Sequence, residues 1–361
     1  MITISSRSPY QIIVNEAGQT GSKVEVFVWN KGTTEPTIPT RTMSESIASV
    51  TQTQTNYNIS PFIIEYINQI NATKVLSAAT EEDTDWCLVK VKRYKLVGTV
   101  ATLLDTISYV GVNGFTKVFD GLNFDKSTSN KILLLANENI NNTYHSDATD
   151  TAFVNYLIDK AIDKTLKATY ERNDGIAYSV VQDLLTGESG IFNLKVPLSL
   201  VITDGTFING CKLTLSYDTI DNVINSYPID ECKYTPVECS FINSFGGWQF
   251  LTFFKAQSNS INVKGSEYNL MQSNVAYNPL IGNSKAFNIN GTQAVKLNTG
   301  WVAQNYDELI HDLMLSETVL IDNKPANVKS KSMTYKTQLK DKMINYEIEF
   351  EYSFDLLNNI V

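Results

Sequence analysis

Two histidines and four cysteines are the side chains of this sequence best suited to catalysis or metal binding. The histidines, His145 and His311, lie far apart in the chain, and the cysteines form no CxxC pair. Zinc ligands usually come in pairs at short spacing, so the sequence argues against a structural zinc site. Reduced, buried thiols are the favoured state of Cys87, Cys211, Cys232 and Cys239, and a Cys232–Cys239 disulfide is the alternative that the spacing allows.

Acidic residues offer two further candidates for chemistry. His311 would share the charged face of a short helix with Asp307, Glu308 and Asp312, where a general base is one interpretation and a solvated histidine the favoured one. His145 lies in an Asn-rich loop, and the same preference applies. A second acidic group precedes Trp86 and consists of Glu81, Glu82, Asp83 and Asp85. Paired carboxylates can hydrolyse glycosides or hold calcium, but a linear run like this is typical of a solvated turn.

The known catalytic motifs are missing from the sequence. It contains no GxSxG elbow, Walker loop, GxGxxG after a strand, or HExxH. We therefore expect no catalytic, metal or cofactor-binding residue, and no cofactor. Four tryptophans could line a sugar-binding platform, although apolar neighbours favour core positions for Trp29, Trp86, Trp248 and Trp301.

Composition narrows the class of protein further. The net charge is −9, from 29 basic and 38 acidic residues. A chain this acidic lacks the positively charged surface that non-specific binding to a phosphate backbone requires. Specific nucleic-acid binding is therefore not expected. The sequence has no apolar run of signal-peptide or membrane-span length, so we expect no membrane span. After synthesis in the cytoplasm, the protein either stays there or leaves by a route other than a classical signal.

The elements that must carry any site are mainly strands. Between residues 344 and 355 apolar and acidic or polar residues alternate without a break, which predicts one long strand with one buried face. The 18 tyrosines and 16 phenylalanines also favour strands. The expected fold class is mainly β with minor α: two β-sandwich domains, immunoglobulin/fibronectin-like or jelly-roll-like, with a helix-containing middle segment.

Three segments follow from this pattern. Residues 1–97 are predicted to form an N-terminal β-sandwich that includes strands at 11–14, 23–29 and 86–97 and a short helix starting at Ser60–Pro61 with Ser60 as N-cap. Residues 98–191 form a mixed middle segment with strands at 115–119 and 131–136. Residues 192–361 form a C-terminal β-rich domain with a second short helix at 307–315.

The middle segment carries the clearest helical spacing in the chain. Its apolar residues predict an amphipathic helix over 151–170 with a wide stripe: Phe153, Val154, Leu157, Ile158, Ala161, Ile162 and Leu166. Such a stripe usually packs on the protein's own sheet, and packing on a neighbouring subunit is the alternative. We therefore treat Phe153 and Leu157 as candidate interface residues.

The C-terminal segment offers the second hint of assembly. The Phe245–Gly246–Gly247–Trp248 run between two apolar stretches predicts a hairpin. Phe253 and Phe254 follow, and neighbouring residues of a strand point to opposite faces. One of these two rings must lie outside the main core, against another element or a partner subunit. Phe253 and Phe254 complete the candidate interface.

The sequence contains several distinctive strings, at residues 8–10, 23–30, 57–63, 231–237, 241–247, 253–255, 297–301 and 341–347. These strings resemble a structural tail protein, of the ring type, from crAss-like and related short-tailed bacteriophages of Bacteroidetes. This resemblance covers both ends of the chain and carries no catalytic residue. It implies a virion component, made in the host bacterial cytoplasm and located in the phage tail or the head–tail junction, with a homo-oligomeric ring and other tail or portal proteins as partners.

The resemblance therefore implies a non-enzymatic ring component that lines or surrounds the DNA passage. Its contact with genomic DNA would be passive, because an acidic lining repels phosphate. A carbohydrate-binding or receptor-adhesion module is the alternative and would require an exposed Trp or Tyr platform. A glycoside hydrolase is a third candidate and would require two facing carboxylates in a cleft.

Overall fold

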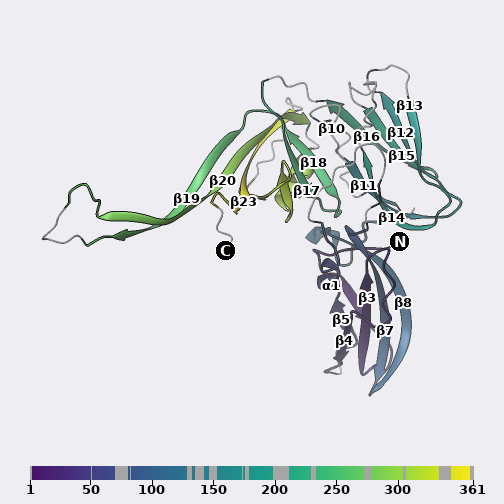
Figure 1. The fold of residues 1–361 in the computed structure, drawn as a ribbon. Helices are drawn as coiled ribbons and strands as arrows, with labels where there is room; N and C mark the ends of the chain where they lie inside the picture. Colours follow the sequence, from purple (N-terminus) through teal and green to yellow (C-terminus); the bar gives the residue numbers. More distant parts are fainter. Residues whose placement is uncertain are drawn as a thin grey trace. The chain divides into compact units, whose positions relative to one another are not determined.

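The computed structural model describes residues 2–49, 51–69, 80–81, 83–127, 132–134, 142–145, 153–172, 174, 179–197, 211–228, 233–271, 278–303, 306–332 and 343–357. These residues are mainly in strands, with two α-helices, so the predicted fold class is confirmed (Figure 1). The chain divides into two compact units. Unit 1 comprises residues 1–230, 240–251 and 305–316, and unit 2 comprises residues 231–239, 252–304 and 317–361.

Unit 1 begins with a five-stranded sheet in the order β1-β8-β7-β3-β4. A ribbon of β2 (Gln11–Val14) and β5 (Thr55–Asn58) and the short helix α1 (Ser60–Ile64) share one hydrophobic core with this sheet. The core joins Val14 and Ile63 to Val24 and Val91. The strands of the sheet are β1 (Thr3–Ser5), β3 (Gly21–Trp29), β4 (Arg41–Ser46), β7 (Trp86–Val97) and β8 (Val100–Val112).

The N-terminal sheet does not end at the predicted limit of residue 97. β8 continues to Val112 and pairs with β7 along its whole length. The register shifts between Arg93 and Tyr94, where the sequence alternation was already broken. The N-cap prediction is also wrong, because Ile59 occupies that position. The Ser60 hydroxyl instead donates to the Ser8 carbonyl at 2.6 Å.

Unit 1 also contains a second sandwich. One sheet has the order β10-β16-β15-β12-β13 and the other β6-β14-β11-β9. Their facing residues form one core in which Tyr156 and Leu194 meet Tyr170 and Leu213. The strands are β6 (Thr80–Glu81), β9 (Ile132–Leu134), β10 (Asn142–His145), β11 (Phe153–Lys160), β12 (Leu166–Arg172), β13 (Ser179–Leu185), β14 (Gly190–Pro197), β15 (Cys211–Tyr217) and β16 (Ile220–Pro228).

The helix predicted over 151–170 is therefore wrong. Its residues form β11 and β12, which lie in different sheets. β11 pairs with β14 on one side and with β9 on the other, and six successive residues from Phe153 are buried. A strand covered on both faces has no alternation, so its apolar run imitates helical spacing. The predicted strand at 115–119 is also wrong, because Val118–Asp120 form a 3-10 helix, η1.

Unit 2 contributes most of a seven-stranded sheet in the order β18-β17-β21-β22-β23-β20-β19. The boundaries between the units fall within β17 and β18, whose hairpin was predicted. Helix α2 (Tyr306–Met314), also predicted, belongs to unit 1. The strands are β17 (Val237–Ile242), β18 (Trp248–Phe253), β19 (Ser258–Asn269), β20 (Ser284–Ala303), β21 (Val319–Ile321), β22 (Lys324–Val328) and β23 (Met343–Asp355).

The long strand predicted at 344–355 is confirmed as β23. Its apolar residues from Ile344 to Phe350 are buried and the residues between them are exposed. Ile348 pairs with Leu297 of β20, and Phe350 pairs with Val328 of β22. The pairing places β23 between β20 and β22 within the sheet, and the alternation places one of its faces in the core. Beyond Phe350 the strand leaves the core, and Phe354 is 63% exposed.

Candidate functional sites

The four candidate interface residues do not share a surface. Phe153 and Leu157 are buried in β11, and the Phe153 ring packs edge-on against Phe250 at 4.9 Å between centroids. Phe253 is buried and packs edge-on against Phe350 at 5.7 Å. Phe254 is half-buried. As expected, one of the two neighbouring rings lies outside the core, while three of the four candidates are covered by the chain itself.

The histidines and cysteines are not brought together either. His311 lies on α2, with Nδ1 at 3.8 Å from Oδ1 of Asp312, and His145 ends β10 in another part of unit 1. Cys87 and Cys239 are buried free thiols, and Cys232 lies outside the described residues. Burial raises the pKa of the Cys87 thiol to about 12, which makes it a poor nucleophile. Within the described ranges, no group of three or more His, Cys, Asp or Glu could hold a metal ion.

The described acidic residues that precede Trp86 do not form one cluster, and the four tryptophans do not form one platform. Glu81 pairs with Lys31 at the surface, whereas Asp85 is buried with Oδ2 at 3.9 Å from Nζ of Lys195; Glu82 lies outside the described residues. These carboxylates face cations rather than each other, so they form no glycosidase pair. Trp86 and Trp248 are buried and Trp29 half-buried, whereas Trp301 is 61% exposed.

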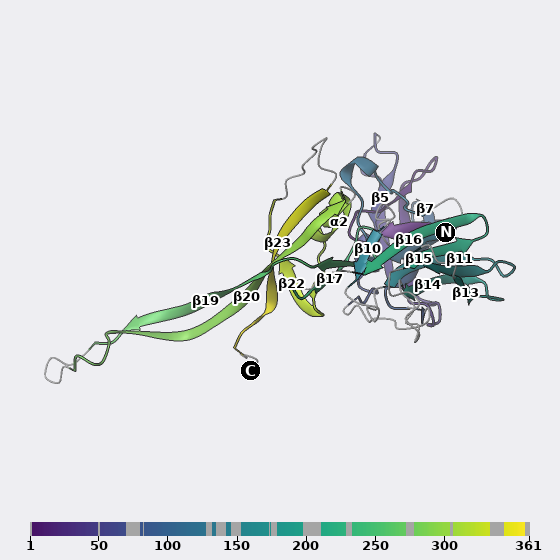
Figure 2. The ribbon, with the colours of Figure 1, turned by 90° about the horizontal axis from the view of Figure 1, so that it is seen from above.

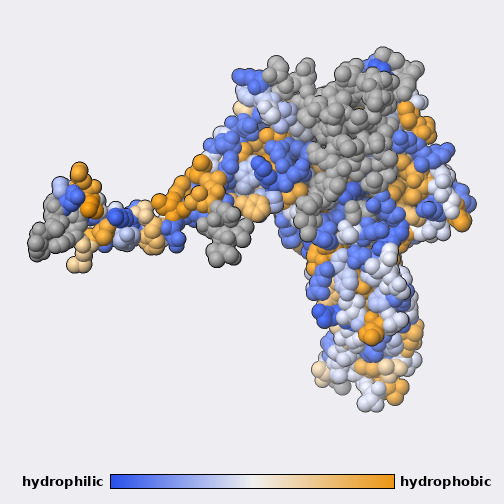
Figure 3. Space-filling model, in the orientation of Figure 1, coloured by the Kyte–Doolittle hydropathy of each residue, from blue (hydrophilic) through white to orange (hydrophobic). Residues whose placement is uncertain are grey.

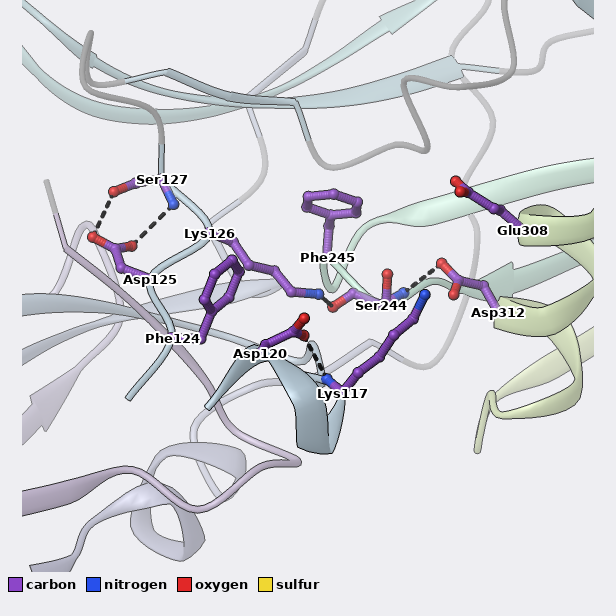
Figure 4. A pocket seen from close by; sticks show the side chains of 10 residues that line it. All are labelled: Lys117, Asp120, Phe124, Asp125, Lys126, Ser127, Ser244, Phe245, Glu308 and Asp312. Atoms are coloured by element: carbon purple, nitrogen blue, oxygen red, sulfur yellow. Dashed lines mark hydrogen bonds between the residues drawn. The ribbon is translucent and has the colours of Figure 1, made fainter. Parts of the chain in front are cut away.

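Unit 1 contains a cavity that the sequence did not predict (Figure 4). It has a volume of about 450 Å³ and lies between η1, the loop that follows it, the turn between β17 and β18, and α2. Two phenylalanines, two serines, two lysines and four carboxylates line it: Lys117, Asp120, Phe124, Asp125, Lys126, Ser127, Ser244, Phe245, Glu308 and Asp312. Neither His nor Cys is among them, so the lining lacks a nucleophile–imidazole pair.

Close backbone packing positions the turn that forms one wall of this cavity. The Asn243 side-chain oxygen accepts hydrogen bonds from the backbone N–H groups of Phe245 and Gly247, at 3.0 and 3.1 Å. Gly246 has a φ of +89°, and a Cβ there would come within 2.8 Å of the Asn113 backbone nitrogen. Asp312 accepts a hydrogen bond from the Ser244 N–H at 3.1 Å. These contacts fix Ser244 and Phe245 against α2.

Lys126 is the most unusual group in the cavity. Its ammonium donates to the Ser244 carbonyl oxygen and lies 4.6 Å from the centroid of the Phe245 ring (Figure 4). Burial lowers the pKa of Lys126 to about 8, against the opposing attraction of Asp312 and Asp120. The amine is therefore mostly charged at neutral pH. A wall with aromatic rings and more carboxylates than lysines suits an apolar or cationic occupant better than an anion.

An exposed apolar loop adjoins this cavity. We call residues 118–124, which contain η1, the apolar loop. Phe119 is fully exposed, and Val118, Leu122 and Phe124 are also exposed. The Asp120 carboxylate accepts a hydrogen bond from the Lys117 N–H at 2.7 Å, which closes the turn and holds these side chains outward. Because Phe124 also lines the cavity, the loop and the cavity form one continuous surface.

Unit 2 carries a projecting exposed feature, which the sequence did not predict either. We call residues 258–291, as far as they are described, the arm. The arm consists of β19 and the first part of β20, and both views show it extending out of the rest of unit 2 (Figures 1 and 2). All twelve residues of β19 are exposed. β20 pairs with β23 only from Thr292 onward, so the described part of the arm is a two-stranded ribbon.

Apolar side chains are numerous on the arm (Figure 3). Val263 is 67% exposed and Ile261 62%, and both lie on the strand face that continues the core face of the sheet. Further out, the Tyr268 and Phe287 rings contact each other edge-on at 5.6 Å between centroids. At the base, the backbone N–H of Leu356 donates to the Gly291 carbonyl at 2.7 Å. The other exposed apolar residues of the arm are Met271, Leu280, Ile281 and Ile289.

The sequence does contain a signal for the arm. Ile261 and Val263 alternate with polar residues, Phe287 and Ile289 do the same, and a turn-prone stretch with Pro279 and Gly282 lies between them. This is the pattern of a hairpin. Nothing in such a pattern says whether its apolar face meets a core or solvent.

No protein-family model and no curated protein matches this chain at a significant level. Neither of the two helices formed by the described residues combines the length and the apolar character that spanning a bilayer requires.

Proposed function

We propose that this protein is a non-enzymatic building block of a phage virion, a ring-forming subunit of the tail or the head–tail junction. The observation that carries the proposal is the arm. A two-stranded ribbon is marginally stable in water, and one that exposes Ile261, Val263, Tyr268 and Phe287 has side chains to bury against a partner. An assembly subunit needs such a projecting surface, whereas an isolated enzyme or binding domain does not.

Two further observations support this assignment. The strings that resemble ring-type tail proteins of short-tailed phages lie in both units, including β17, β20 and β23. The net charge of −9 suits a ring around a DNA passage, because an acidic lining repels phosphate and lets the genome slide. On this proposal the partners are further copies of the chain and neighbouring tail or portal proteins, and the protein resides in the virion.

A glycan- or receptor-binding module is the second candidate, and the exposed Trp301 favours it. Its indole is available for stacking on a sugar ring, although the neighbouring side chains provide no second tryptophan for a platform: Trp29, Trp86 and Trp248 are buried or half-buried. A glycan array separates the two candidates. Binding that Trp301→Ala abolishes would favour adhesion over ring formation.

Native mass spectrometry over a wide range of protein concentration tests the proposed function. We expect self-association that rises with concentration and ends in a closed ring. A chain that remains monomeric at every concentration, without an added partner, would contradict the proposed ring. Turnover of polysaccharide or peptidoglycan that is lost on mutating one carboxylate would contradict the non-enzymatic assignment.

A further inference from the structure

We propose that the arm of one copy seats on the apolar loop and the adjoining cavity of a second copy of this chain. This inference rests on the proposed function and adds the two surfaces that meet. The contact is head-to-tail, because the arm belongs to unit 2 and the apolar loop to unit 1. A contact between two different surfaces generates a ring when the rotation closes.

The first argument is that both surfaces expose apolar side chains that their own copy leaves in solvent. On the arm, Val263 and Ile261 are more than three-fifths exposed. On the apolar loop, Phe119 is fully exposed and Val118 is 94% exposed. Seating one on the other removes both sets from water in a single contact, and the burial of apolar surface is the main driving force of association.

The second argument is the shape of the two surfaces. The arm is a projecting ribbon whose described backbone pairs with no third strand. The cavity of about 450 Å³ beside the apolar loop offers a hollow with two phenylalanines in its wall. A projecting apolar side chain of the arm can enter this hollow, and an anchor that fills a pocket is the arrangement that dominates the energy of most interfaces.

The third argument is charge, and it favours a copy of this chain as the occupant. Between residues 258 and 291 the only charged residues are Lys264, Lys285 and Glu267, which gives the arm a net charge of +1. The whole chain carries −9, so the rest of it carries −10. Four carboxylates and two lysines line the cavity, a local net charge of −2. A weakly cationic arm is therefore attracted to the acidic surface of another copy.

Two exposed substitutions test the contact without disturbing a core. Val263→Asp places a carboxylate on the arm, and Phe119→Asp places one on the apolar loop. Ser260→Asp on β19 and Val100→Asp at the start of β8 are the matched controls, since both positions are exposed; Ser260 lies on the strand face opposite Ile261 and Val263, and Val100 lies outside the arm and the apolar loop. Circular dichroism and thermal unfolding establish that each variant folds as the unchanged protein does.

Native mass spectrometry of each variant alone and of their mixture gives the decisive result. Val263→Asp and Phe119→Asp should each weaken self-association by about tenfold or more, because each removes a large apolar contact. The two controls should associate normally. An equimolar mixture of the two variants should form 1:1 dimers and nothing larger, because each pair retains one intact arm and one intact loop.

The outcomes separate this inference from the proposed function. If the unchanged protein forms a ring and both variants do so equally well, the arm contact is wrong and the ring stands. If the mixture gives the full ring, or gives no dimer when each variant alone is impaired, the head-to-tail pairing of these two surfaces is overturned. If the unchanged protein never associates, the proposed ring itself fails, and the contact fails with it.

Discussion

Two long hairpins of similar local structure behave in opposite ways in this molecule. In unit 1, β7 and β8 pair along their whole length, and their inner residues, such as Val91 and Val110, are buried. In unit 2, β19 pairs along its whole length with the first part of β20, yet all of β19 is exposed. The difference lies in the neighbours: β3 and β1 flank the first hairpin, whereas β19 ends its sheet. Strand pairing alone therefore does not place a hairpin in a core; the neighbouring strands do.

The same substitution should therefore have opposite results in the two hairpins. Val91→Asp places a carboxylate in the core of the five-stranded sheet and costs several kcal/mol, a large part of the ~5–15 kcal/mol stability of a typical domain. Val263→Asp leaves the carboxylate in water, so the free energy of unfolding should change by about 0.5 kcal/mol or less. Urea unfolding of the two variants makes the comparison. Equal destabilisation would mean that the arm packs within its own copy.

A second pair of substitutions tests what holds the arm at its base. Ile348 is buried on β23 opposite Leu297 of β20, while its neighbour Glu349 is exposed. Ile348→Asp should unfold the seven-stranded sheet. The sheets of unit 1 should remain folded, so only part of the molecule's ordered structure is lost. Glu349→Lys faces Lys296 across the strands and should cost only about 0.2–1 kcal/mol. Hydrogen exchange measured strand by strand distinguishes the two results. If Glu349→Lys alone unfolded the sheet, the acidic face of β23 would be the buried one.

An ion pair on the first hairpin should have a smaller effect than either substitution in a core. Arg93 donates to Asp105 across β7 and β8, with Nε at 2.8 Å from Oδ1. The hydrogen bonds from Arg93 lower the pKa of Asp105, against the effect of burial. Stability from this pair is therefore fully present above the ordinary aspartate pKa and is lost as the pH falls through the lowered value. Asp105→Asn should cost up to about 1 kcal/mol at neutral pH, less in high salt. A loss that persists in acid would contradict the ion-pair explanation.

Much of the fold could be predicted wherever one face of a strand is wet. β23 was predictable because Glu347 and Glu349 separate buried Tyr346, Ile348 and Phe350. The strand at Phe153 was not, because both of its faces are covered and no polar residue marks the period. For the same reason Phe153 and Leu157 were predicted to lie at an interface, whereas they belong to the core.

The candidate surfaces were harder to predict than the fold. Val263 on the arm and Val91 in the core both sit in alternating stretches, and only the neighbouring strands tell them apart. Phe119 belongs to a short polar-flanked run that gives no periodic signal. The cavity joins Lys126 to Phe245 and Asp312, which are far apart in sequence, so its composition depends on tertiary packing alone.

The position of β23 in its sheet also sets an order of events during synthesis. It is translated after every other strand of the seven-stranded sheet, yet it lies between β22 and β20. Before β23 is synthesised, no strand links β22 to β20 in the sheet. At that stage β23 does not yet support the base of the arm. A nascent chain therefore carries its projecting hairpin before the base that orients it exists. The seven-stranded sheet closes only when β23 pairs with both neighbours, so the arm acquires its fixed base with the strand of this sheet that comes latest in the chain.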